Sequence, residues 1–265
     1  MLQVARDLRE EAEALHAFLQ TLSAAHWQQP TGFMGWTPWD VVAHLHYYDG
    51  VSLLAVSDPA GFAEKRAEIV RRIGAGESNA ELARSDFGAW SAAELLARWL
   101  ETCRGLAGRL GAAEAGRRLP WFGPDMGVRM FTTARLMETW AHGQAIYDLL
   151  RAPRQATPRL RNVAAIGVRT YGWTFANRGQ KPPGPPPYVH LQGPEGDTWE
   201  WNEPSEHDFV RGSALDFCMT VTQVRNVADT KLEVAGESAR RWMEIAQCFA
   251  GGPVDPPQPG QRVGA

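Results

Sequence analysis

Apolar residues at helical spacing dominate the first part of the chain. In the first segment they recur at intervals of three and four, at Leu8, Ala12, Leu15, Leu19 and Leu22. This spacing predicts one face of an amphipathic helix. Further helices are predicted over residues 60–75, 91–110 and 129–150, and the Gly- and Pro-rich stretch 116–128 predicts a loop.

The start of a second helix is marked by Thr37-Pro38-Trp39-Asp40. Thr37 can cap the helix, Pro38 suits its first turn, and Asp40 can reach back to the capping residue. The helix continues through VVAHLHYYDGVSLLAV. Long helices with modest connections predict an up-and-down helical bundle.

A different pattern begins after residue 150. Residues 159–179 predict one helix, and KPPGPPP predicts a stiff extended lead-in to a strand, with an SH3-type ligand as the alternative. YVHLQG and DTWEWN alternate with a period of two and predict a β-hairpin across GPEGD. SALDFCMTVTQ and SARRWMEIAQCFA predict two more helices. The fold class is therefore mainly α with a smaller α+β domain: a helical bundle over 1–152, an α+β domain over 153–252 and a disordered tail over 253–265.

Composition excludes several classes of protein. The 265 residues are 44% hydrophobic, which is enough for a buried core, and 27 Lys+Arg against 30 Asp+Glu give a net charge of −3 without a basic block. This balance argues against a nucleic-acid partner. The absence of a signal-peptide pattern and of a long apolar stretch predicts a soluble, cytoplasmic protein without a membrane partner. The widely spaced Cys103, Cys218 and Cys248 fit neither a disulfide framework nor a thiolate zinc site, and we expect them to be buried.

The most informative spacing is Glu138-x-x-x-His142 in the last helix of the predicted bundle. Four residues place both side chains on one helix face, one turn apart. The same face carries residues that should point into the bundle: Phe131, Ala134, Ala141, Ala145 and Leu149. A buried Glu and His need a partner or a metal ion, so the alternatives are metal binding, a simple ion pair or a half-exposed face.

A second source of ligands lies in the second helix. His44 shares a face with Val41, Tyr48 and Val51, whereas His46 lies about 200° further round and cannot bind the same ion. Two histidines and one carboxylate suit a divalent cation, typically zinc. Aromatic residues near these positions are expected to line an apolar substrate pocket: Trp36, Tyr48, Trp121 and Trp140.

The segments that carry these residues resemble a known family. WTPWDVVAHLHYYD and ARLMETWAHGQ resemble the metal-binding core of the DinB-like superfamily, and within it the mycothiol-dependent maleylpyruvate isomerase branch. LDFCMTVTQ, VADTKL and RWMEIAQCFAG resemble an uncharacterised actinobacterial-type family of that branch, often labelled a metal-binding or "wyosine base formation" protein. The resemblance extends to about residue 252.

This resemblance implies both a fold and a chemistry. It implies a four-helix bundle with a divalent metal held by His44, Glu138 and His142, followed by a domain similar to the sterol-carrier-protein fold. It also implies a low-molecular-weight thiol as cosubstrate, used to isomerise or thiolate a small molecule. A basic residue of the C-terminal domain assists in the isomerase, and Arg225 is the candidate here. An arginine can hold a substrate carboxylate through two parallel hydrogen bonds.

Two other functions remain open at the level of sequence. A metal-dependent hydrolase would activate water and would need a general base, for which Asp49 is the nearby acid of the second helix. A non-catalytic carrier would bind a lipid-like ligand in the C-terminal domain. The sequence does not distinguish zinc from nickel or another divalent ion, nor a monomer from a homodimer.

Overall fold

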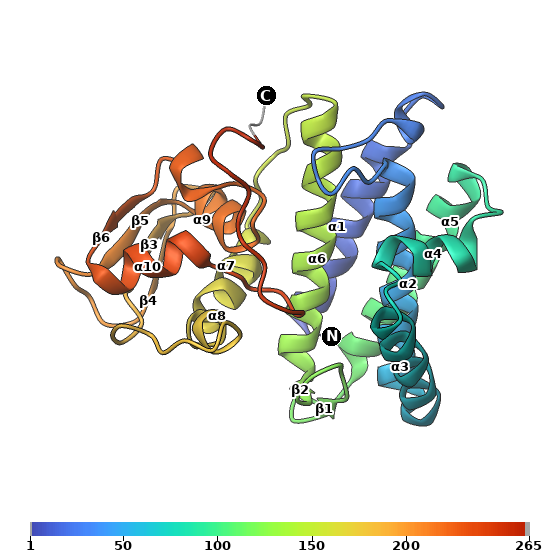
Figure 1. Ribbon diagram of the computed structural model, residues 1–265, viewed down its shortest axis with the longest axis horizontal. Helices are drawn as coiled ribbons and strands as arrows, with labels where there is room; N and C mark the ends of the chain where they lie inside the picture. Colours follow the sequence, from blue (N-terminus) through green and yellow to red (C-terminus); the bar gives the residue numbers. More distant parts are fainter. Residues whose placement is uncertain (1, 263–265) are drawn as a thin grey trace. The chain divides into compact units, whose positions relative to one another are not determined.

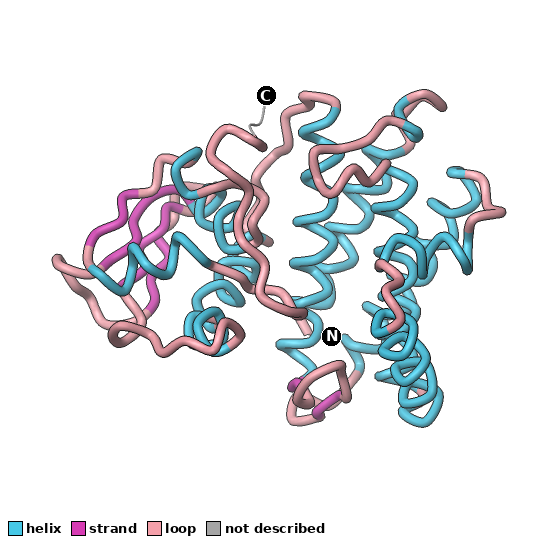
Figure 2. Tube along the Cα trace, viewed as in Figure 1, coloured by secondary structure: helices cyan, strands magenta, loops and turns pink. Residues whose placement is uncertain are grey.

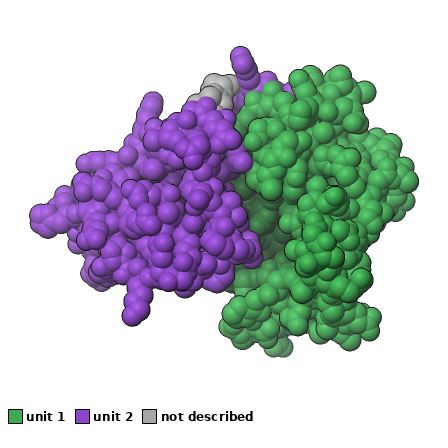
Figure 3. Space-filling model, in the orientation of Figure 1, with its two compact units in different colours: residues 1–149 green, residues 150–265 purple. Residues whose placement is uncertain are grey.

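The computed structural model describes residues 2–262, which form two compact units. Figure 3 colours the first unit, residues 1–149, green and the second, residues 150–265, purple. The chain is mainly helical with one small sheet region, as the sequence predicts. Among the described residues, no helix combines the length and the apolar character that crossing a membrane requires.

The first unit is built from helices. They are α1 (Gln3–Leu19), α2 (Pro38–Ser57), α3 (Pro59–Gly74), α4 (Asn79–Phe87), α5 (Ala92–Ala112) and α6 (Val128–Leu149). A short 3-10 helix, η1 (His26–Gln28), precedes α2, and a two-stranded ribbon of β1 (Arg118–Leu119) and β2 (Met126–Gly127) precedes α6. The long helices pack against one another, with α1 and α2 each contacting both α5 and α6 (Figure 1).

The capping residues predicted for α2 adopt their expected roles. The Asp40 backbone N–H donates to the Thr37 hydroxyl oxygen over 3.3 Å, and the Thr37 backbone N–H donates to the Asp40 carboxylate over 2.9 Å. A second capping box, Ser78 with Glu81, begins α4, a helix that we did not predict. Both boxes satisfy backbone donors that the first turn of a helix leaves unpaired.

Helix α2 is buried on several sides because it contacts four other helices of its unit. Its buried residues therefore include polar ones, among them His44, Asp49 and Ser52. Buried polar groups need partners, since leaving one unpaired costs roughly 1–3 kcal/mol. These positions are where the first unit can carry chemistry.

The second unit contains a four-stranded sheet and short helices. The strands are β3 (Tyr188–Gln192), β4 (Thr198–Trp201), β5 (Phe209–Ser213) and β6 (Glu233–Ala235), in the order β4-β3-β5-β6 (Figure 2). Strands β3 and β5 are parallel and the other pairs antiparallel, and the predicted hairpin is confirmed with His190 opposite Glu200. The helices are α7 (Leu160–Arg169), α8 (Tyr171–Ala176), α9 (Ala214–Val221) and α10 (Glu237–Ile245), with the 3-10 helix η2 (Val227–Asp229) between α9 and β6.

Two predictions for the second unit differ from what the structure describes. The single helix expected over 159–179 is divided at Thr170, whose hydroxyl donates to the Ile166 and Gly167 carbonyl oxygens and competes with the continuing backbone ladder. The segment 253–262, expected to be disordered, is hydrogen-bonded to its own unit: the Gln223 side chain donates to the Val254 carbonyl and Asn226 to that of Pro257. Residues 263–265 of the predicted tail lie outside the described residues.

Candidate metal centre and its surroundings

Three side chains far apart in the sequence meet in the first unit. His44 comes from α2, and Glu138 and His142 come from α6. One candidate ligand atom from each lies within 4.8 Å of the other two. The Glu138 Oε2 atom is 3.0 Å from His142 Nε2 and 3.9 Å from His44 Nε2. The structure thus brings together the three residues that the sequence singled out.

The protonation states of this group follow from burial and from mutual contact. Burial lowers the pKa of His44 to about 4, with a further contribution from the neighbouring His142. Burial alone would raise the pKa of Glu138, but the hydrogen bond with His142 and the close approach of His44 outweigh it and hold that pKa below its usual range. At neutral pH the group therefore contains an ionised carboxylate beside a neutral imidazole, the forms in which these side chains bind metal ions.

The donor atoms fit a divalent cation. The His44 Nδ1 atom is buried without a hydrogen-bond partner, and the 3.9 Å between its Nε2 atom and Glu138 is too long for a hydrogen bond. The gap between His44 Nε2 and Glu138 Oε2 leaves these two donors free to bind one ion together. Two imidazoles and one carboxylate also match the ligand sets of catalytic zinc sites.

Aromatic rings pack against the two imidazoles. The Trp36 ring lies 5.0 Å from that of His44 and is stacked on His142 at 5.7 Å between centroids. Phe33 meets His142 edge-on at 5.1 Å, and Tyr48 lies 4.9 Å from His44. The surroundings of the three candidate ligands are therefore largely apolar on these sides.

A tight turn supplies two of these rings. The Trp36 backbone N–H donates to the Phe33 carbonyl over 2.9 Å, and the two residues between them, Met34 and Gly35, both have positive φ angles. This conformation suits Gly but is unusual for Met, and it brings the first and fourth residues of the turn together. Phe33 was not predicted as a site residue, because nothing in a loop sequence indicates which side chain turns inward.

Tyr48 is held by a residue from the helix that we did not predict. Its hydroxyl donates to the side-chain oxygen of Asn79, at the start of α4, over 2.6 Å. Burial raises the pKa of Tyr48, so the phenol stays neutral at physiological pH. The Ser78/Glu81 capping box was the available signal for α4, but no local pattern connects Asn79 with Tyr48.

The other two predicted aromatic residues lie differently. Trp121 packs on Phe62 and Phe131 and meets Phe122, whose ring lies 6.2 Å from Tyr48. It is thus connected to the candidate centre through other rings. Trp140 is buried, but two residues along α6 correspond to about 200°, so it and Glu138 lie on opposite faces of that helix.

His46 lies on another face of α2 from His44. Its ring packs on Phe87 at 4.8 Å and on Trp90 at 5.6 Å between centroids. These neighbours belong to α4 and to the turn before α5. His46 is therefore not among the residues that the structure gathers around Glu138.

Asp49 does not have the surroundings of a general base. Its side chain is fully buried, one carboxylate oxygen accepts from Arg135 and the other accepts from Trp99. A general base must reach the proton that it removes, and both oxygens of Asp49 are already engaged. The structure therefore gives no support to the role considered for Asp49 in a hydrolase.

Arg225 belongs to the second unit, just after α9. It is buried, with 5% of its surface exposed, and its guanidinium donates to the Val224 carbonyl over 3.0 Å. The neighbouring Asp229, considered as an ion-pair partner, accepts hydrogen bonds from the Gly260 backbone N–H. The role of Arg225 toward a substrate stays a prediction.

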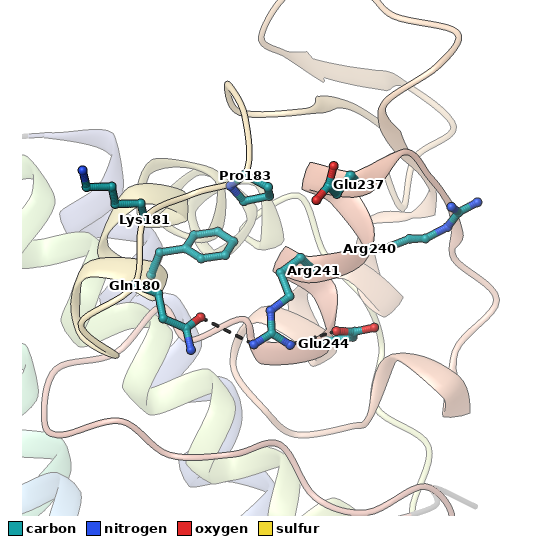
Figure 4. Close-up of a pocket in the computed structure, with 8 residues that line it drawn as sticks. Gln180, Lys181, Pro183, Glu237, Arg240, Arg241 and Glu244 are labelled. Atoms are coloured by element: carbon teal, nitrogen blue, oxygen red, sulfur yellow. Dashed lines mark hydrogen bonds and ion pairs between the residues drawn. The ribbon is translucent and has the colours of Figure 1, made fainter.

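The second unit also has a charged groove of about 490 Å³, which contains none of the predicted site residues. Figure 4 shows Arg241 between Gln180 and Glu244, with hydrogen bonds to both. Lys181, Arg240 and Glu237 also line the groove. Both basic and acidic side chains therefore line the groove.

The three cysteines are buried, as the sequence predicts, and carry no disulfide. Burial raises the pKa of the Cys103 and Cys218 thiols. A thiol with a raised pKa and no access to solvent is a poor nucleophile. The protein's own cysteines are therefore unsuited to catalysis.

The chain is similar to proteins of one family. The model of the mycothiol maleylpyruvate isomerase N-terminal domain matches residues 8–147. Two uncharacterized proteins of Mycobacterium tuberculosis, Rv0036c of strain H37Rv and MT0041 of strain CDC 1551, are each 44% identical over 248 residues, which is 93% of this chain and 95% of theirs.

The fold is also found in solved structures. The crystal structure of the mycothiol-dependent maleylpyruvate isomerase matches with a TM-score of 0.53, at 13% identity over 82% of this chain and 87% of that one. A point mutant of the same enzyme matches with a TM-score of 0.52 at 12% identity. At these identities the likeness shows a shared fold. The family match covers more than half of the sequence, so the chain belongs to the mycothiol maleylpyruvate isomerase N-terminal domain family.

Proposed function

We propose that this protein is a divalent-metal-dependent enzyme that uses a low-molecular-weight thiol as cosubstrate, as an isomerase or a thiol S-transferase. The observation that carries the proposal is the meeting of His44, Glu138 and His142 within 4.8 Å in a chain of this family. Zinc is the proposed ion because of its preference for nitrogen and carboxylate ligands, and nickel is the alternative.

The three side chains supply a preformed set of donors. A divalent metal bound to them would lower the pKa of a small thiol, so that the thiolate is available at neutral pH. Glu138 contributes the negative charge, and His44 contributes a neutral nitrogen at a buried position. The apolar rings of Trp36 and Phe33 limit the access of water to the imidazoles.

The thiol must come from outside the protein because Cys103, Cys218 and Cys248 are all buried. The solved relatives are named as mycothiol-dependent, and mycothiol is therefore the proposed cosubstrate. Addition of a thiolate to an activated double bond permits rotation about the resulting single bond, and its departure restores the double bond. A thiolate can equally displace a leaving group, which gives the transferase alternative.

The substrate is proposed to be a small molecule with an apolar part and a carboxylate. Trp36 and Tyr48 are proposed to contact the substrate directly. Trp121 is proposed to act through Phe122. Trp140 is also proposed to line the pocket, although it lies on the opposite face of α6 from Glu138. Arg225 is proposed to bind the carboxylate, because the planar guanidinium of an arginine can hold a carboxylate through two parallel hydrogen bonds.

The finer architecture is proposed together with the function. We propose that the first unit is a DinB-like four-helix bundle ending near residue 152 and that residues 153–252 form a sterol-carrier-like domain. The proposed location is the cytoplasm, where small thiols are kept reduced.

Metal analysis of the purified protein, followed by a thiol-dependent assay, tests the proposal. We expect about one divalent ion per chain, and turnover of maleylpyruvate or a related unsaturated acid that requires mycothiol and is abolished by a chelator. Turnover that needs no thiol, or a protein that binds no divalent ion, would contradict the proposal.

A further inference from the structure

We propose that the buried ion pair between Asp49 and Arg135 fixes the spacing of α2 and α6 and so preforms the metal centre. Both are positioning residues, since they act through the helices that carry the ligands. The inference rests on the proposed function, because it assumes that His44, Glu138 and His142 bind a metal ion.

The ion pair is buried, and one hydrogen bond joins its two side chains, with a second guanidinium nitrogen in ion-pair contact. The Arg135 Nε atom donates to Asp49 Oδ1 over 3.1 Å, and Arg135 Nη2 lies 3.0 Å from the same oxygen. The Trp99 indole donates to Asp49 Oδ2 over 3.1 Å. The side chains of Asp49 and Arg135 are 0% and 5% exposed. One carboxylate therefore joins three helices, α2, α5 and α6.

The pair lies close to the ligands along both helices. Arg135 precedes Glu138 by three residues and shares its face of α6, and Asp49 follows His44 by five residues on α2. At a rise of about 1.5 Å per residue, these separations are roughly 4.5 and 7.5 Å along the helix axes. A shift of one helix at the ion pair would therefore move its ligand by a similar distance.

The ion pair of Asp49 with Arg135 joins α2 to α6 by a polar contact of hydrogen-bond length. The approach of His44 Nε2 to Glu138 Oε2, at 3.9 Å, is longer and lies within the candidate centre itself. Helix α2 packs much more extensively on α5 than on α6. Apolar packing alone thus leaves the distance between His44 and Glu138 weakly determined, and the ion pair determines it.

A buried ion pair of this kind need not contribute to folding stability. Replacing a buried ion pair with apolar residues of similar volume is often neutral or stabilising, whereas removing one partner is strongly destabilising. A variant that replaces both residues together therefore separates a role in folding from a role in positioning. Groups that orient metal ligands from outside typically change metal affinity by roughly 10–100-fold when they are altered.

The experiment compares zinc affinity with thermal stability in the full-length protein. The test variants are the double replacement Asp49→Leu/Arg135→Met and the single Arg135→Lys, which keeps the charge but loses the planar fork. Arg84→Met is the matched control, because it breaks an ion pair of α2 with α4, in which Arg84 Nε lies 2.7 Å from Asp40 Oδ1, and leaves α6 untouched. The dissociation constant for Zn²⁺ is measured by competition with a chromophoric chelator, and Tm is measured on the metal-free protein.

We expect the double variant to fold, with a Tm lowered because the Trp99 indole loses its acceptor, and to bind Zn²⁺ at least tenfold more weakly. The zinc affinity of Arg135→Lys should lie between those of the wild type and the double variant. The zinc affinity of Arg84→Met should equal that of the wild type. Equal zinc affinity in the wild type and the double variant would overturn the inference while leaving the proposed metal centre intact. If the double variant fails to fold, the zinc affinity of Arg135→Lys tests the inference instead. A wild-type zinc affinity in Arg135→Lys overturns the inference, and weaker zinc binding at an unchanged Tm supports it. A wild-type protein that binds no zinc would contradict the proposed function itself.

Discussion

The indole of Trp36 and the imidazole of His142 lie nearly parallel, with 8° between their planes and 5.7 Å between their centroids. Trp36 also contacts His44, so a single residue of the loop before α2 contacts the rings of both candidate histidine ligands. The two histidines come from different helices, and Trp36 packs against both of them.

Replacing Trp36 with leucine should separate binding of the substrate from binding of the metal. We expect Trp36→Leu to keep about one metal ion per chain, because the ligands are unchanged, and to raise KM roughly tenfold through lost aromatic contact with the substrate. Trp90→Leu is the control, since Trp90 packs around His46 on another face of α2. A KM unchanged by Trp36→Leu would exclude Trp36 from the substrate pocket.

Alanine at any of the three candidate ligands should remove most of the bound metal. We expect this for His44→Ala, Glu138→Ala and His142→Ala, because each removes one of three protein donors. His46→Ala should retain the metal, since its ring packs on Phe87 and Trp90. Elemental analysis after gel filtration measures the outcome. An empty site in His46→Ala together with a full one in His44→Ala would refute the ligand assignment.

Zinc should raise the Tm of the metal-free wild-type protein. An ion that binds only the folded state stabilises it by RT ln(1 + [L]/Kd), about 2.7 kcal/mol at a free concentration of 100 Kd. Differential scanning fluorimetry of the chelator-treated protein measures the shift over a series of Zn²⁺ concentrations. The same titration of His142→Ala should give a much smaller shift. Equal shifts in both proteins would place the stabilising ion elsewhere.

Removal of all three cysteines should leave thiol-dependent turnover intact. The side chains of Cys103, Cys218 and Cys248 are buried, so a Cys→Ala variant loses packing but no accessible nucleophile. We expect a loss of unfolding free energy of about 1 kcal/mol per site and an unchanged kcat with added mycothiol. The experiment combines denaturant unfolding with steady-state kinetics. A folded triple variant without activity would assign a catalytic role to a cysteine.

Arg225→Ala should keep the metal and weaken transition-state binding. The expected loss is about 2–4 kcal/mol in kcat/KM, typical for removing one partner of a buried charge pair. Arg225→Lys should recover part of the loss, because lysine lacks the planar fork of arginine. Arg240→Ala, in the charged groove of the second unit, provides a control with a similar change in charge. An unaltered kcat/KM in Arg225→Ala would end its assignment to the substrate.

The sequence predicted the features that depend on local spacing. The capping box at Thr37, the shared helix face of Glu138 and His142, and the opposed faces of His44 and His46 all follow from the helical period. Each of these features is found in the structure.

The features that the sequence did not predict depend on contacts between distant segments. Arg135 pairs with Asp49 across 86 residues, and Asn79 binds Tyr48 across 31. Phe33 reaches His142 from a loop, where no periodicity indicates direction. The helix breaks at Thr170 because the threonine hydroxyl competes with backbone N–H groups for the Ile166 carbonyl. Helical propensity alone does not reveal this competition.

The hydrogen-bonded segment 253–262 has a practical consequence for anyone who shortens this protein. This segment accepts hydrogen bonds from the Gln223 and Asn226 side chains, and its Gly260 backbone N–H donates to Asp229. It is therefore bonded to residues on both sides of Arg225. Ending the gene at residue 252, where the family resemblance stops, would leave the buried Gln223 amide with the Ala246 carbonyl alone. An expression plasmid should therefore retain these ten residues, however dispensable their proline-rich sequence looks.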